Sequence, residues 1–209
     1  MRARPIAPAL IIEDLRDRID KAPRDAWQRV AVDGAPAAEP WVLADALVDP
    51  LRAAGRDVVR VSTRDFLRPT SLRYEFGRHD PDVYYDQWLD IGGLVREVLA
   101  PLDPGGTGRV LPSLWDSELD RATRAAYTPV APGGVLLLDG SLLLGRGLPL
   151  DLSVHLTLSP GALARRTPDD ETWTLPAFAR YDREADPLRT ADVVLKTDDP
   201  DHPALIESA

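Results

Sequence analysis

The stretch WQRVAVDGAPAAEPW, residues 27–41, contains an apolar strand, a turn and the start of a helix. Apolar side chains alternate around Val30 and Val32, and the alternation stops at Gly34, which is typical of a strand that ends in a turn. Pro40 precedes an apolar repeat with helical spacing at residues 41–54, and proline is favoured in the first turn of a helix. The stretch therefore predicts a strand, a loop and a helix in direct succession.

Strands and helices alternate along the rest of the chain. Apolar runs predict strands at residues 57–62, 110–115, 135–139, 152–158 and 192–196, and helical spacing predicts helices at residues 6–21, 84–102 and 160–166. The run VLLLD at 135–139 is apolar up to its aspartate, as in a parallel strand buried on both faces. This alternation is typical of βαβ units. It predicts one α/β domain over residues 1–209, with a mostly parallel sheet and an N-terminal helical segment at 1–24.

The composition excludes several classes of protein. Acidic residues number 34 against 25 basic residues, a net charge of −9, which argues against a general nucleic-acid binder because such a protein needs a basic face. The absence of cysteine excludes disulfide bonds, thiolate zinc sites and a cysteine nucleophile. No apolar run approaches the roughly 18 residues of a membrane span, and the N-terminus lacks the pattern of a secretion signal. We therefore expect a cytoplasmic protein that binds neither nucleic acid nor membrane.

The loop after the first strand differs from a phosphate-binding loop at three positions. The motif of such a loop, G-x-x-x-x-G-K-[ST], begins in register at Gly34. Glu39 then replaces the second glycine, Pro40 replaces the lysine, and Trp41 replaces the hydroxyl residue that holds magnesium. A carboxylate repels an anion, and proline has neither a charge nor an amide hydrogen. From its residues alone, the segment is a plain strand-to-helix loop.

Charged side chains follow the second predicted strand, beside the first loop. The segment VSTRDFLRP, residues 61–69, contains Arg64, Asp65 and Arg68. Because ligands bind at the carboxyl ends of strands in α/β sheets, Asp65 is a candidate to accept a proton from a substrate hydroxyl. A solvated surface loop explains the same residues equally well.

Residues 73–86, RYEFGRHDPDVYYD, mix arginines, aromatic residues and acids, as suits a polar ring or sugar ligand. Aromatic rings would stack on such a ligand and acids would bind its hydroxyl groups. The candidates for substrate binding are Arg73, His79, Asp80, Tyr84 and Tyr85. Asp80-Pro81 is also a good helix start, so Asp80 is equally a candidate helix cap.

Asp139 and three arginines complete the set of candidates. Asp139 directly follows an apolar run, where nucleotide enzymes place a carboxylate that orders water around magnesium. Arg165, Arg166 and Arg180 flank a polar segment at about residues 165–186, which is a candidate lid over phosphates and equally a solvated surface. The three histidines are isolated and no metal-ligand spacing is present, so we predict no metal site made of protein ligands.

Together these segments resemble the uridine kinase-like family of P-loop kinases, in particular its short actinobacterial type. The likeness spans about residues 27–205 and depends on the segments VAVDG, VSTRDFLRP, RYEFGRHDPDVYYDQWLD, LLLDGSLLL, DLSVHLTLS and RYDREADPLRTADVVLKTDDP in this order. The resemblance implies a three-layer P-loop NTPase fold with a five-stranded, mostly parallel core and a lid near residues 165–186. It also implies that ATP, with magnesium, phosphorylates a hydroxyl group of a nucleoside or similar acceptor.

The chain departs from this family where the family's chemistry is expected. In the family, the aspartate that accepts the proton lies two residues before the phenylalanine of the loop after the second strand. This chain has Arg64 at that position, and its nearest aspartate, Asp65, lies one residue further along the chain. The acidic residue with which the family binds the sugar would fall near His79. The nearest acid in this chain, Asp80, again lies one residue further along. The residues that match family positions better are Asp139, Arg165, Arg166 and Arg180.

Four functions are compatible with the sequence. The first is a degenerate kinase homologue with weak or no ATP-dependent phosphotransfer that keeps a cleft for a small nucleoside- or sugar-like ligand. The others are an active nucleoside-type kinase with an unorthodox phosphate loop, an enzyme of different chemistry (for example in specialised metabolism) that reuses the cleft, and an interaction module. The first is favoured because the lysine, the magnesium hydroxyl and the aligned aspartate are lost together. ATP and magnesium are implied by the family alone, so the cofactor stays unassigned and a homodimer is left open.

Overall fold

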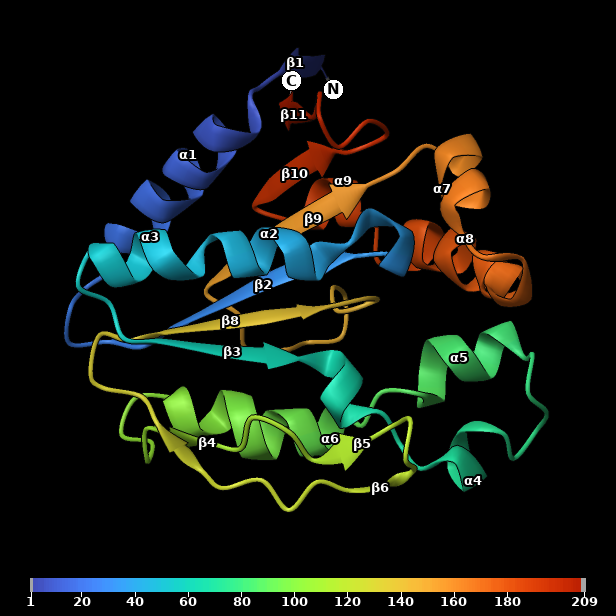
Figure 1. Ribbon diagram of the computed structural model, residues 1–209, viewed down its shortest axis with the longest axis horizontal. Helices are drawn as coiled ribbons and strands as arrows, with labels where there is room; N and C mark the ends of the chain where they lie inside the picture. The colour runs from blue at the N-terminus through green and yellow to red at the C-terminus, as the bar shows by residue number, and fades with distance from the viewer. Residues whose placement is uncertain (1, 208–209) are drawn as a thin grey trace.

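A seven-stranded sheet forms the centre of the computed structural model, which describes residues 2–207 (Figure 1). The strands lie in the order β1-β11-β10-β9-β2-β8-β3. All neighbours from β10 to β3 are parallel, whereas β11 and β1 are added antiparallel at one edge. The bounds are Arg2–Pro5 (β1), Gln28–Gly34 (β2), Val58–Ser62 (β3), Val135–Gly140 (β8), Leu152–Thr157 (β9), Val193–Lys196 (β10) and Ala204–Glu207 (β11). The predicted parallel core of five strands is confirmed, with β2 at its centre and β8 beside it.

Helices cover both faces of this sheet and complete a three-layer α/β fold (Figure 1). One face is covered by α1 (Pro8–Asp20), α2 (Pro40–Ala46) and α3 (Val48–Ala53), and the other by α6 (Ile91–Leu94) with the π-helical turn η3 (Val95–Leu99) and the 3₁₀ turn η4 (Ala100–Leu102). The other helical elements are η1 (Pro36–Ala38), η2 (Thr63–Phe66), α4 (Thr70–Arg73), α5 (Pro81–Gln87), α7 (Pro160–Arg166), η5 (Asp169–Thr174), α8 (Leu175–Glu184) and α9 (Pro187–Thr190). Within residues 2–207, no helix combines the length and the apolar character that crossing a bilayer requires.

Strand β8 shows why its sequence is apolar without interruption. Val135 and Leu137 belong to the core beneath α1, α2 and α3, whereas Leu136 and Leu138 belong to the core on the opposite face. All four side chains are fully buried, because successive side chains of a strand point to opposite faces and both faces of this sheet are covered. The pattern that predicted a buried parallel strand is thus explained by the two helical layers.

The strands outside the parallel core differ from the sequence-based expectation. The strand predicted at residues 110–115 is wrong, because β4 (Arg109–Val110) and β5 (Trp115–Asp116) are two-residue strands outside the main sheet. They pair with β7 (Thr128–Pro129) and β6 (Arg121–Ala122) in two separate small sheets. The edge strands β1 and β11 were not predicted, since four residues are too few to display a clear alternation.

Two predicted helices are interrupted for local reasons. The helix predicted at residues 41–54 divides between α2 and α3, because Pro50 has no amide hydrogen to donate to the carbonyl group four residues earlier. The helix predicted at residues 84–102 breaks after α5, where Leu89 forms a β-bridge with Leu67. A new helix then starts because the Asp90 carboxylate accepts a hydrogen bond from the Gly93 amide at 2.9 Å.

The buried carboxylate of Asp33 connects the central strand to the elements around its carboxyl end. Its Oδ1 accepts a hydrogen bond from the Leu143 amide at 2.9 Å, and its Oδ2 accepts one from the Tyr181 hydroxyl at 2.9 Å. The same Oδ2 lies 2.7 Å from Nδ1 of His155 on β9. Tyr181 also accepts a hydrogen bond from the Leu144 amide, and burial, followed by the charge of Asp33, raises the pKa of its phenol. This network fixes α8 against the sheet.

We expect Tyr181→Phe to lower the free energy of unfolding by about 1–3 kcal/mol, because it leaves the Leu144 amide without its partner and removes one donor from Asp33. The measurement is urea denaturation followed by circular dichroism. Tyr127→Phe is the matched control, because the Tyr127 hydroxyl binds Glu97 on the surface and its loss should cost clearly less. Equal losses in the two variants would contradict the anchoring role of Tyr181.

Candidate functional site

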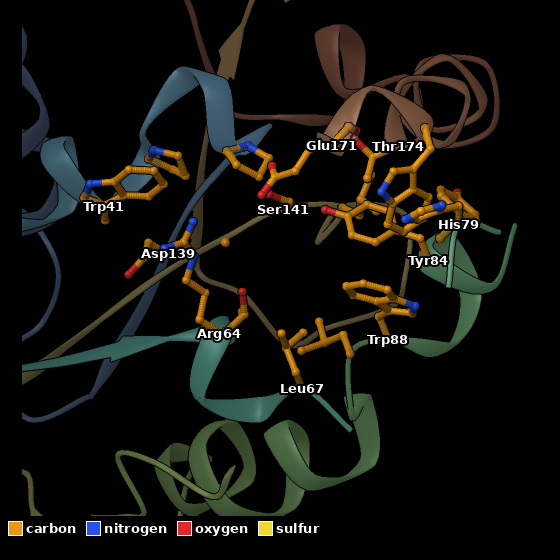
Figure 2. Close-up of a pocket in the computed structure, with 18 of the residues that line it drawn as sticks. Trp41, Arg64, Leu67, His79, Tyr84, Trp88, Asp139, Ser141, Glu171 and Thr174 are labelled. Carbon is orange, nitrogen blue, oxygen red and sulfur yellow. Dashed lines mark hydrogen bonds between the residues drawn. The ribbon is translucent and has the colours of Figure 1, made fainter. Parts of the chain in front are cut away.

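A cavity of about 430 Å³ opens at the carboxyl ends of the parallel strands, between β3, β8, α2, α5 and η5 (Figure 2). This is the edge of an α/β sheet at which ligands bind, and the volume lies within the usual range for small-molecule sites. The residues whose polar or charged groups line it are Trp41, Thr63, Arg64, Tyr74, Arg78, His79, Tyr84, Tyr85, Trp88, Asp139, Ser141, Arg146, Asp170, Glu171, Trp173 and Thr174. The cavity is therefore a polar and aromatic site at the position that the fold favours.

One side of the cavity is a wall of aromatic rings around Tyr84. The Tyr84 ring lies 4.9 Å from Trp88, 5.6 Å from Trp173 and 6.0 Å from Phe178 between ring centroids, in edge-to-face geometry. Tyr84 and Trp88 are four residues apart, so α5 and the residue after it present them on the same face. Helix α5 begins where it does because the Asp80 carboxylate accepts hydrogen bonds from two amides of its first turn.

The phenol of Tyr84 faces charges of both signs. Figure 2 shows its ring between the aromatic wall and the open centre of the cavity. Burial raises the pKa of this phenol, the negative charge of Glu171 raises it further, and the positive charge of Arg64 opposes the rise. The hydroxyl group therefore stays protonated at neutral pH and can donate a hydrogen bond to a ligand.

The opposite side of the cavity carries Trp41 and Arg64 (Figure 2). The guanidinium carbon of Arg64 lies 4.8 Å from the centroid of the Trp41 ring, a cation–π contact. Trp41 comes from the first turn of α2, and Arg64 comes from η2, directly after β3. Two residues that are 23 positions apart in the sequence, from the ends of two different strand–helix connections, are thus in contact with each other.

Asp139 is buried at the end of β8 with its charge already paired. Its Oδ1 lies 2.8 Å from Nη1 of Arg60, and its Oδ2 accepts a hydrogen bond from the Ser62 hydroxyl at 3.0 Å. Arg60 also forms an ion pair with the exposed Asp45 at 2.8 Å. The charge of the carboxylate is therefore offset by Arg60, although its Oδ1 accepts no hydrogen bond among the described residues. Among residues 2–207, no three His, Asp or Glu side chains are placed to hold a metal ion.

The loop at residues 34–41 is folded back on itself. The Ala38 amide donates to the Ala35 carbonyl at 2.8 Å and the Glu39 amide donates to the Pro36 carbonyl at 3.0 Å, so η1 uses both donors internally. Pro36 and Pro40 have no amide hydrogen, and Glu39 adopts a left-handed conformation with φ of 53°. A Cβ atom at Gly34 would lie 3.1 Å from Leu156, so the close packing of β9 already explains this glycine.

The structure places seven of the predicted residues around the cavity and eight elsewhere. Those that line it are Pro40, Trp41, Arg64, His79, Tyr84, Tyr85 and Asp139. Those that do not are Gly34, Glu39, Asp65, Arg73, Asp80, Arg165, Arg166 and Arg180. Asp65 accepts a hydrogen bond from the Ser113 hydroxyl at 3.2 Å, and burial raises its pKa. Asp80 is the helix cap of α5, the second of the two roles that the sequence allowed.

The predicted arginines outside the cavity contact protein groups. Arg73 lies 5.0 Å from the Trp88 ring centroid and donates to the Arg68 carbonyl, so it supports the aromatic wall from behind. Arg180 forms an ion pair with Asp86 at 2.9 Å and lies over the Tyr85 ring at 4.3 Å. Arg166 donates to the Thr197 carbonyl at 3.1 Å. The segment 165–186 is therefore attached to α5 and to the end of β10.

Several cavity residues were missed by sequence reasoning. Trp88 could have been predicted from the sequence, because it follows Tyr84 by one helical turn and therefore lies on the same face of the helix. Glu171 and Trp173 could not, because they are distant in sequence from α5 and reach the cavity only through the packing of η5 and α8. Arg146 was also missed, and it holds the wall by donating hydrogen bonds to the Tyr85 and Leu142 carbonyls.

Solved structures share this arrangement of strands and helices. A possible uridine kinase from Bacillus stearothermophilus superimposes with a TM-score of 0.71 and 19% identity, over 88% of this chain and 96% of that chain. The fold is that of the P-loop kinases. A putative fructose transport system kinase from Silicibacter sp. gives a TM-score of 0.61 and 22% identity over 88% and 92% of the two chains, and a D-glycerate 3-kinase from Cryptococcus neoformans gives 0.52 and 15% over 84% and 78%. No family model and no curated protein matches the sequence.

This likeness confirms the uridine kinase-like P-loop kinase fold that the sequence motifs indicated. Residues 34–41 begin with the last residue of β2, the central strand of the parallel core. The cavity lies between the segment that contains Pro36, Pro40 and Trp41 and the aromatic wall. At identities of 19% and 22%, the likeness concerns the fold and does not by itself transfer an activity.

We expect Arg60→Met to lower the free energy of unfolding by about 3 kcal/mol, because it leaves the Asp139 carboxylate buried without its counter-charge. Asp45→Asn is the matched control, since it removes the other ion pair of Arg60 from an exposed position and should change stability little. The double variant Arg60→Met/Asp139→Asn should recover much of the loss. Urea denaturation checks all three, and a harmless Arg60→Met would show that Asp139 is not neutralised by Arg60.

Proposed function

We propose that this chain is a uridine kinase-like P-loop protein that binds a small nucleoside- or sugar-like ligand, with weak or no transfer of phosphate from ATP. The observation that carries the proposal is the loop at residues 34–41, whose Ala38 and Glu39 amides are bonded to carbonyl groups of the loop itself. A phosphate cradle needs such amides to point at the anion. The loop therefore does not fit ATP, and no catalytic step through ATP or magnesium follows from its residues.

The charges around the loop support the same proposal. Glu39 stands in the sequence where the motif has its second glycine, and Pro40 contributes no charge at the start of α2. Trp41 has no hydroxyl group for magnesium, and Asp139 is paired with Arg60. Phosphoryl transfer depends mainly on positioning and charge neutralisation, and every tenfold loss of rate corresponds to about 1.4 kcal/mol of transition-state stabilisation. The combined losses are therefore expected to reduce turnover strongly.

The aromatic side of the cavity supports the binding of a small planar or ring-shaped ligand. Aromatic rings stack on bases and on the apolar faces of sugars, and the polar groups of Tyr84, Ser141 and Glu171 can hydrogen-bond a ligand's hydroxyl groups. The names of the similar structures refer to uridine, fructose and glycerate, which are all small hydroxyl-bearing compounds. An active kinase with an unorthodox loop is the main alternative. A cytoplasmic location and a homodimer stay predictions of the sequence.

We expect isothermal titration calorimetry with millimolar ATP and magnesium to give no saturable binding to the wild-type protein. Uridine and D-fructose are tested in parallel, and a ligand of the cavity should quench the fluorescence of Trp88 and Trp173. The variant Trp88→Leu should lose the part of this quenching that comes from Trp88 and keep the part from Trp173, with the ATP result unchanged. Saturable binding of ATP at ordinary kinase affinity would overturn the proposal and favour the active kinase.

We expect the triple variant Glu39→Gly/Pro40→Lys/Trp41→Ser to bind ATP and magnesium measurably. It restores the turn, the phosphate charge and the magnesium hydroxyl, and it returns an amide donor to the start of α2. Turnover should remain low because Arg64 is unchanged. Circular dichroism must first show a folded variant, and Glu39→Gly/Trp41→Ser is the control that keeps Pro40. A folded triple variant that does not bind ATP would mean that the cavity has been remodelled beyond the loop.

A further inference from the structure

We propose that the ligand of the cavity is anionic, and that a carboxylate or phosphomonoester group on it pairs with the guanidinium of Arg64. This inference rests on the proposed function, because it concerns the ligand class of the same cavity. It starts from the fact that Arg64 lines the cavity while, among residues 2–207, no carboxylate lies within 4.0 Å of its guanidinium nitrogens. An arginine fork with free donors is well suited to a carboxylate or phosphate.

Of the other arginines near the cavity, Arg60 and Arg146 have their donors occupied by the protein, whereas the exposed Arg78 lies 5.7 Å from the Tyr74 ring centroid, on the aromatic side away from Arg64. Arg60 is paired with Asp139 and Asp45, and Arg146 donates to the carbonyl groups of Leu142 and Tyr85. Arg64 instead lies over the Trp41 ring, which holds the guanidinium without using its hydrogen-bond donors. Trp41 therefore orients the cation and leaves its donors available for a ligand.

The remaining charges define the orientation of the ligand. Asp139 is already neutralised by Arg60, so it does not compete with a ligand for Arg64. The acids Asp170 and Glu171 belong to η5, and the cation Arg78 precedes α5 next to the aromatic wall. Figure 2 shows Glu171 entering the cavity from the side opposite to Arg64. An anionic group is therefore favoured at Arg64, and hydrogen-bond donors of the ligand are favoured near Glu171.

The aromatic wall completes the description of the ligand. The charges of both Arg64 and Glu171 act on the pKa of the Tyr84 phenol, and Figure 2 shows Tyr84 at the aromatic side of the cavity. A planar ring packed against Tyr84, Trp88 and Trp173 would bring a substituent towards Arg64 across the cavity. The ligand class is thus a planar ring with one oxyanion group and at least one hydrogen-bond donor.

Two matched pairs of probes test this proposal by calorimetry. Uracil and orotate share a ring and differ by a carboxylate, whereas uridine and uridine 5′-monophosphate differ by a phosphate. We expect orotate to bind at least tenfold more tightly than uracil, or uridine 5′-monophosphate to bind at least tenfold more tightly than uridine. The first result would identify a carboxylate as the preferred group, and the second would identify a phosphate. Inorganic phosphate alone should bind much more weakly than the preferred anionic probe, because it has no ring to contact the aromatic wall.

The variant Arg64→Gln should reduce the ratio between anionic and neutral probe to about one, with circular dichroism as the test of folding. Arg109→Gln is the matched control, because it removes the same charge from an exposed position on β4 outside the cavity and should keep the ratio. Arg64→Lys should restore part of the affinity ratio, since lysine returns the positive charge without the forked donors of the guanidinium group.

The outcomes separate this inference from the proposed function. Equal binding of neutral and anionic probes, with no effect of Arg64→Gln, would overturn the anionic ligand while leaving a small-ligand cavity. A ratio that falls equally in Arg64→Gln and Arg109→Gln would assign the preference to overall charge and would also overturn it. Saturable binding of ATP and magnesium to the wild-type protein would overturn the proposed function, and the absence of binding by all four probes would overturn the inference.

Discussion

The buried carboxylate of Asp33 is the constraint on which the arrangement of the site depends. It lies at the carboxyl end of the central strand with no exposed surface, so its charge must be met by groups of the protein. The Leu143 amide, the Tyr181 hydroxyl and His155 meet it from three different segments. Because an unpartnered buried charge is costly, β9, α8 and the segment after β8 have to lie at fixed positions around this strand end.

Those positions create the two unlike sides of the cavity. Helix α8, held by Tyr181, brings η5 and its Trp173 against Tyr84, and this contact builds the aromatic side. On the other side, the loop after β2 closes on its own carbonyl groups, and Arg64 stacks on Trp41. The same fold therefore frames a cavity with an aromatic side and a side formed by the loop after β2 and Arg64. On the second side, the loop amides are bonded within the loop and Asp139 is paired with Arg60.

The candidate site could be predicted from the sequence only where a residue's position followed from a strand end or a helix start. Asp139 and Arg64 were located in this way, because each follows a strand of the parallel core. Asp80 lies in the predicted segment, yet its carboxylate is used by the first turn of α5, since a helix-capping aspartate and a ligand-binding aspartate have the same local sequence. Trp173 and Glu171 had no local signal, because only the packing of η5 beside α5 brings them to the cavity.

The sequence by itself determined the parallel core, since runs such as residues 135–139 bury both faces of a strand and leave it few other environments. It also determined that the loop after β2 lacks the glycine, lysine and hydroxyl of a phosphate-binding loop, because these are properties of residue type alone. Tertiary structure decided which charges remain available to a ligand. Arg60 neutralises Asp139 across neighbouring strands, while Arg64 lies on the face of Trp41 and, within residues 2–207, donates no side-chain hydrogen bond. Such pairings depend on distances between side chains that are remote in sequence, and only the folded chain sets those distances.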